Sequence, residues 1–172
     1  MFDAWSRKKR YRCAICGDEH EDLPAVAATA PAQYDWASGE ERSAEFELTS
    51  DTCVWNNEHF FIRCVLEIPY SDQCGALSFG VWSTLSEANY KLYLDAWDRP
   101  DRSDLEPMFG WFSNQLPGYP DTMNLACEVH PRDDGLRPLI TLEPSDHLLA
   151  LQQVSGIRLD EAARYVHAHL GI

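Results

Sequence analysis

One segment of the chain, Glu58–Ile68, restricts the possible folds more than any other. From Phe60 onward its even-numbered positions are all apolar, whereas Arg63 and Glu67 stand among the odd-numbered ones. Because side chains alternate between the two faces of a strand, this pattern predicts a half-buried β-strand with its even face inward. Pro69 marks the end of the strand.

Other strands are indicated on both sides of this segment. Thr52–Trp55 precedes it, and Asn56-Asn57 can form the connecting hairpin turn because asparagine tolerates positive φ. Short turns between consecutive strands favour antiparallel pairing. Later strands are predicted at Ala76–Thr84, Phe109–Asn114, Thr122–His130 and Arg137–Leu142. We expect the last of these at an edge of the sheet, because the proline at position 138 donates no ladder hydrogen bond.

Three helices are predicted from start signals and apolar periodicity. The first spans Glu87–Trp97, with Ser86 as its N-cap and an aromatic stripe that we interpret as core packing. The second runs to Val154 from a candidate N-cap at Ser145. The third spans Leu159–Leu170, with its apolar residues on one face.

This order of elements predicts an α+β fold, in which one antiparallel sheet carries helices on one face. Residues 13–172 are expected to form a single domain that begins with a CxxC turn resembling a zinc knuckle. Residues 1–12 are expected to be a basic N-terminal tail, and Ala25–Glu47 is expected to be mostly loop, with room for one short helix.

Charge divides the chain unevenly. The 172 residues carry a formal net charge of −14, but residues 1–12 hold five basic residues and one acid, so they carry +4 and the remainder carries −18. Such an acidic body argues against general nucleic-acid binding, which needs a basic surface. It suits contact with a basic protein partner, although acidity that only supports solubility is an alternative.

The sequence also limits the membrane and export classes. No apolar run approaches the roughly 20 residues that a bilayer-spanning helix needs. The charged N-terminus lacks the apolar stretch of a secretory signal peptide. We therefore expect a soluble cytoplasmic protein that does not bind membranes.

The main chemical signal is Cys13-x-x-Cys16 followed by Gly17. This spacing lets two thiolates reach one zinc ion, and a structural site takes four ligands. His20 is the natural third ligand and Cys53 the candidate fourth. Two alternatives remain, a redox CxxC motif and two unrelated thiols beside a turn.

The other three cysteines are Cys64, Cys74 and Cys127. They lie within or beside apolar strands, and a disulfide framework is not expected in a reducing cytosol. We interpret each as a small buried hydrophobic residue.

A second candidate site lies at Glu143, Asp146 and His147. The two carboxylates could orient the imidazole, and a metal-dependent enzyme of unknown reaction could use all three. The competing interpretation is a structural histidine at a helix start. No GxSxG, HExxH, P-loop or GxGxxG motif occurs, so no particular reaction is indicated.

The aromatic, turn-rich stretch FGWFSNQLPGYPDT could line a groove. Trp111, Asn114 and Tyr119 are its candidates for contact with a ligand or a partner. The alternative is a rigid loop, fixed by its prolines, whose aromatic side chains are packed.

Five stretches of the chain, taken in order, resemble one bacterial family. They are CAICGDEHEDLP, DTCVWNNEHFFIRCVLEIP, FGVWSTLSEANY, FGWFSNQLPGYPDTMNL and RPLITLEPSDHLLALQQVSGI. The family is known only as domain of unknown function 2199. Its pattern falls on Cys13, Cys16, Gly17 and His20, on Asp51 and Cys53, and on Glu143, Pro144, Asp146 and His147.

The resemblance implies no activity, but it makes an accidental CxxC less credible and so strengthens the expectation of bound zinc. We therefore expect a non-enzymatic binding protein with structural zinc and an acidic surface. The metal-dependent enzyme is the alternative.

Overall fold

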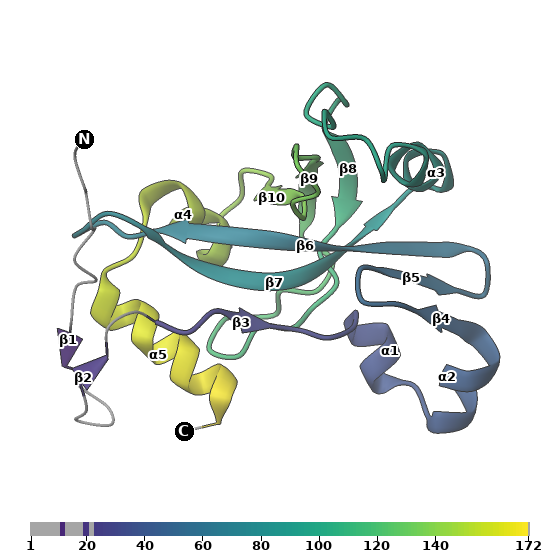
Figure 1. The fold of residues 1–172 in the computed structure, drawn as a ribbon. Helices are drawn as coiled ribbons and strands as arrows, with labels where there is room; N and C mark the ends of the chain where they lie inside the picture. The colour runs from purple at the N-terminus through teal and green to yellow at the C-terminus, as the bar shows by residue number, and fades with distance from the viewer. Residues whose placement is uncertain (1–10, 13–18, 21–22, 172) are drawn as a thin grey trace.

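The computed structural model describes residues 11–12, 19–20 and 23–171. Within these residues it has five α-helices, a mixed but mainly antiparallel sheet of eight strands, and a separate pair of strands, β1 (Tyr11–Arg12) and β2 (Glu19–His20) (Figure 1). The α+β class and the mainly antiparallel sheet are confirmed. The CxxC turn lies outside the described residues.

Most of the predicted elements are present, two of them with the predicted limits, at residues 52–55 and 159–170. The strands of the large sheet are β3 (Val26–Ala27), β4 (Phe46–Leu48), β5 (Thr52–Trp55), β6 (His59–Pro69), β7 (Ala76–Leu85), β8 (Met108–Trp111), β9 (Ala126–His130) and β10 (Leu139–Leu142). The helices are α1 (Ala32–Trp36), α2 (Gly39–Glu45), α3 (Glu87–Asp95), α4 (Leu148–Ser155) and α5 (Leu159–Leu170).

The hairpin of β6 and β7 is the longest part of the sheet (Figure 1). Its strands pair antiparallel from Phe60 opposite Leu85 to Pro69 opposite Ala76. Along the even face of β6, four apolar side chains are fully buried, as the alternation predicts: Ile62, Cys64, Leu66 and Ile68. On the other face Phe61 is buried too, because it packs in a smaller cluster with side chains of β5 and β7.

Two strands share the remaining edge of β6. β5 pairs antiparallel with its first half, and β10 pairs parallel with its second half. They begin next to each other, since the Arg63 N–H donates to the Asp51 carbonyl and the Val65 N–H donates to the Pro138 carbonyl, each at 2.9 Å. From this point, which we call the fork, β5 and β10 run in opposite directions.

The fork explains why the predicted edge position of β10 is wrong. β10 lies between β6 and β9, so it is an interior strand. Pro138 is tolerated because it immediately precedes the strand and contributes its carbonyl to the ladder, where no N–H is needed. A second parallel pair, of β3 with β7, also departs from the purely antiparallel expectation.

The sheet curls so that β8, the strand at the far end of its spatial order, comes back against β7. β8 pairs with β9, and Phe112, directly after β8, forms a bridge to Ser83 of β7. A Cβ atom at Gly110 would come closer to the Thr84 carbonyl and the Ser83 hydroxyl than non-bonded atoms can approach. β8 therefore reaches β7 only because residue 110 has no side chain.

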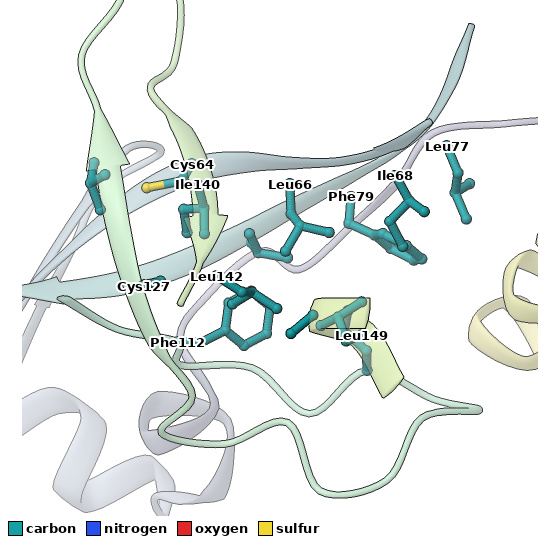
Figure 2. Packing of buried hydrophobic residues seen from close by; sticks show 14 of the residues in the cluster. Cys64, Leu66, Ile68, Leu77, Phe79, Phe112, Cys127, Ile140, Leu142 and Leu149 are labelled. Atoms are coloured by element: carbon teal, nitrogen blue, oxygen red, sulfur yellow. The ribbon is translucent and has the colours of Figure 1, made fainter. Parts of the chain in front are cut away.

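The curled sheet encloses the main hydrophobic cluster. Figure 2 shows part of it, with side chains from the sheet, from Phe112 and from α4 directed into one space. α3 adds Tyr90 and Tyr93, and α5 adds Ala162 and Val166. Fully burying one large apolar side chain stabilises the fold by about 1.5–3 kcal/mol, so α3, α4 and α5 are held by the same core.

The helix starts follow local capping rules. The Ser86 hydroxyl accepts from the Asn89 N–H, as predicted. α4, however, is capped by His147, so the prediction of Ser145 is wrong. The expected loop before residue 47 contains α1 and α2, and α2 begins with a capping box formed by Ser38 and Glu41.

The aromatic stripe of α3 is only partly in the core. Tyr90 and Tyr93 are buried, whereas Leu94 and Trp97 are exposed to 38% and 40%. Trp97 lies beyond the end of the helix at Asp95, so it no longer follows the helical stripe that the periodicity assumes. Leu94 lies within the helix, so its exposure means that the buried face of α3 is narrower than predicted.

Replacing Gly110 with alanine tests the closure of the sheet. We expect Gly110→Ala to lower the free energy of unfolding by about 2–3 kcal/mol, because the new methyl group forces β8 away from β7. Urea denaturation measures the change. Gly39→Ala is the control, since a Cβ there meets nothing within 4 Å. Equal stability of the two variants would contradict the role of Gly110.

Candidate functional site

The sequence predicts four zinc ligands, and the structure describes the side chain of only one. Cys13 and Cys16 lie outside the described residues. For His20 only the backbone is described, paired with Tyr11 in the small sheet. The prediction that these three residues bind zinc therefore stays a prediction.

Cys53, the candidate fourth ligand, is fully buried in β5. It packs with Phe61 and Trp82, and burial raises the pKa of its thiol to about 12. β5 lies at the opposite end of the molecule from β1 and β2 (Figure 1), so the structure does not bring Cys53 near His20. Among the described residues, no three His, Cys, Asp or Glu side chains are placed to hold one metal ion.

The structure confirms the buried position of two of the three other cysteines. Cys64 and Cys127 are fully buried in the main cluster, and burial raises the pKa of both thiols, that of Cys127 to about 11 (Figure 2). The Cys127 sulfur lies 3.3 Å from the Ser83 hydroxyl. The prediction for Cys74 is wrong, because this residue is exposed in the turn between β6 and β7.

His147 has partners for both of its ring nitrogens. Nδ1 accepts from the Leu149 N–H at 3.1 Å and caps α4. Nε2 lies 3.0 Å from the Asp121 carbonyl, to which the neutral ring can donate. Asp146 and Glu143 are exposed, and the shallow hollow that Glu143 lines includes neither of the other two residues. The imidazole therefore holds the helix start, and metal binding or proton transfer would break these contacts.

Asn114 and Tyr119 are also used inside the protein. The Asn114 amide accepts from the Trp82 N–H at 2.7 Å and donates to the Ala30 carbonyl at 3.0 Å. The Asn114 side chain thus connects β7 to the segment that follows β3, beyond the point where the pairing of β3 with β7 ends. The Tyr119 hydroxyl donates to Gln152, and its ring stacks on that of Tyr165 with centroids 4.1 Å apart. Both residues are buried, as the packed-loop alternative describes.

Removing the Asn114 amide tests this link. Asn114→Ala leaves the buried Trp82 N–H and Ala30 carbonyl without these partners, so we expect a loss of about 2–3 kcal/mol in the free energy of unfolding. Thermal and urea denaturation measure the loss. Asn89→Ala, at a half-buried position of α3, is the control. A loss no larger than that of the control would contradict the structural role.

Trp111 differs from the other two aromatic-loop candidates because its side chain is exposed. The residues of β8 alternate, with Met108 and Gly110 inward and Phe109 and Trp111 outward, each 46% exposed. The two outward rings meet edge to face with centroids 5.0 Å apart.

Near these rings the surface is hollowed by about 390 Å³. We call this hollow the aromatic groove, and its main lining residues are Glu58, His59, Phe60, Phe109 and Trp111. Glu128 lies opposite Phe109 on β9 and is exposed as well. Phe109 is not among the site residues predicted from the sequence, although the two-residue period around Gly110 places it on the same face as Trp111.

Residues 12–157 match a family described as an uncharacterized protein conserved in bacteria, DUF2199. The chain belongs to this family. The DUF2199 match covers the whole large sheet and α4. Comparison with curated proteins and with solved structures gives no match. None of the helices in the described parts of the chain is long and apolar enough to cross a membrane.

Proposed function

We propose that this DUF2199 protein is a non-enzymatic binding protein that recognises a basic protein partner at the aromatic groove. The observation that carries the proposal is the exposed pair Phe109 and Trp111, with Glu58 in the same groove and Glu128 exposed opposite Phe109, on a body with a charge of −18.

The groove has the chemistry that binds a lysine or arginine side chain. Exposed aromatic residues are common anchors of protein interfaces, and a cation over a tryptophan ring gains about 0.5–1 kcal/mol at an exposed site. Glu58 lines the groove, and Glu106 and Glu128 are exposed beside its aromatic strand. A basic side chain on Trp111 could therefore also pair with a carboxylate, and the net charge would speed the approach of the partner.

The alternative, a metal-dependent enzyme that uses His147, Asp146 and Glu143, has less support. Both nitrogens of His147 already have backbone partners, and the hollow that Glu143 lines includes neither Asp146 nor His147. A binding role requires none of these groups to be free.

We further propose that the N-terminal segment holds a structural zinc ion through Cys13, Cys16 and His20. The support is the Cys-x-x-Cys-Gly spacing together with the nearby histidine. The position of Cys53 favours a fourth ligand from elsewhere. Zinc would stabilise a short segment that has few apolar residues of its own.

Elemental analysis of protein purified without an affinity tag tests the zinc. We expect about one equivalent, with Cys13→Ser reducing the metal content and lowering Tm, because the ion stabilises only the folded chain. Cys74→Ser is the control, since it removes an exposed cysteine outside the proposed site. Zinc below about a tenth of an equivalent in the unaltered protein would refute the site.

Calorimetric titration with an oligolysine peptide of about eight residues tests the aromatic groove. We expect binding that weakens as salt is raised, and an affinity about fivefold lower for Trp111→Ala, the loss expected for one cation–π contact. Trp36→Ala is the matched control, because Trp36 is 67% exposed on α1. Equal effects of the two substitutions, or no binding at low salt, would contradict the proposed partner site.

A further inference from the structure

A second hollow, of about 330 Å³, lies beside the fork. Tyr93 and Trp97 come from α3 and the turn after it, Arg102 from the next loop, Asp51 from the start of β5, and Arg137 from the chain before β10. We call it the arginine hollow. It shares no lining residue with the aromatic groove, so its role is independent of the function proposed above.

Arg102 is a buried cation, only 2% exposed, and within the described chain its guanidinium donates only to neutral partners. Its guanidinium donates to the carbonyls of Arg132 and Leu136 at 3.2 and 3.0 Å, and to the Tyr93 hydroxyl at 3.5 Å. Within the described chain no carboxylate lies within ion-pair distance of it. Since a guanidinium has five N–H groups, donors remain for a further acceptor.

The rings beside Arg102 complete its surroundings. Its guanidinium lies 5.6 Å from the centroid of Tyr93 and 5.9 Å from that of Trp97. A buried charge is costly unless an opposite charge or several hydrogen bonds compensate for it. One acid that interacts with Arg102 is Asp133. The pKa of the Asp133 carboxyl is lowered mainly by hydrogen bonds from Ser103 and, to a smaller extent, by Arg102. That carboxylate already accepts two hydrogen bonds from Ser103.

Arg137 places a second guanidinium in the hollow. Its Nε donates to Asp51 Oδ1 at 2.6 Å, whereas its two Nη groups have no partner within the described residues. The side chain is 44% exposed, so these groups are accessible.

Arg63 adds a third charge at the fork. Its pKa is lowered by burial and then by the charge of Arg137, and its Nε is buried without a hydrogen-bond partner among the described residues. Among the described residues, Asp51 is the single carboxylate that lines the hollow. Three of the nine basic residues that follow residue 12 therefore lie in the hollow or at the fork beside it, in a body that is otherwise strongly acidic.

The aromatic residues that line the hollow favour a ligand with a planar group. Trp97 is 40% exposed, and its ring meets that of Tyr93 edge to face with centroids 5.8 Å apart. The charged wall and the aromatic wall thus face one small space. Guanidinium groups match the planar geometry of a carboxylate or the oxygens of a phosphate, and an aromatic ring stacks well on tryptophan.

We propose that the arginine hollow binds a small aromatic oxyanion, with its carboxylate or phosphate on Arg102 and Arg137 and its ring against Trp97. The volume limits the ligand to a small molecule. The bound anion would offset the repulsion between the charges of Arg63 and Arg137.

Isothermal titration with phenyl phosphate, benzoate and inorganic phosphate at about 150 mM salt tests this proposal. We expect at least one of the two ring-bearing probes to bind with Kd near or below about 1 mM, and inorganic phosphate to bind more weakly. Arg137→Gln should weaken binding about tenfold, the usual loss for a charged hydrogen bond. Trp97→Ala should weaken it about fivefold.

Arg158→Gln is the matched control, because Arg158 is exposed and its Nε donates to Asp160, much as that of Arg137 donates to Asp51. Circular dichroism and Tm confirm that each variant is folded. Three results would overturn the proposal: neither ring-bearing probe binds at about 20 mM, Arg137→Gln or Trp97→Ala binds as tightly as the control, or inorganic phosphate binds as tightly as phenyl phosphate.

Discussion

The close approach of β8 to β7 at Gly110 is the constraint on which the rest of the structure depends. It allows Phe112 to bridge to Ser83 and turns an open sheet into one that encloses its own core. The same approach decides which aromatic residues are available at the surface. Since side chains alternate along β8, bringing Gly110 inward against β7 turns Phe109 and Trp111 outward.

Both candidate binding surfaces lie where regular strand pairing stops. The aromatic groove lies where β8 meets the end of β7 and the start of β6. The arginine hollow lies at the fork, where β5 and β10 part along one edge of β6. At such points the backbone N–H and C=O groups lack a neighbouring strand and hydrogen-bond to side chains instead. The Trp82 N–H, for example, donates to the Asn114 side chain. These breaks leave space that a continuous sheet would fill.

The sequence predicted the features that depend on near neighbours. The alternation in β6, the Ser86 cap and the apolar face of α5 all follow from local spacing. It did not predict the interior position of β10. A proline fits beside an interior strand here because its carbonyl accepts a hydrogen bond from the Val65 N–H, and this contact exists only in the folded chain. The arginine hollow was equally hidden, since Asp51 and Arg137 are 86 positions apart and meet only in the folded chain.

The fork also has a consequence for the order in which the protein can fold. The β6–β7 hairpin joins neighbouring segments, and isolated hairpins form within about 1–10 μs. β10 can pair with β6 only after the intervening chain has been folded back, which requires the closure of a long loop. Until that happens, one edge of β6 keeps unpaired backbone groups beside apolar side chains. The growing chain is therefore most prone to aggregation before its last strand is in place.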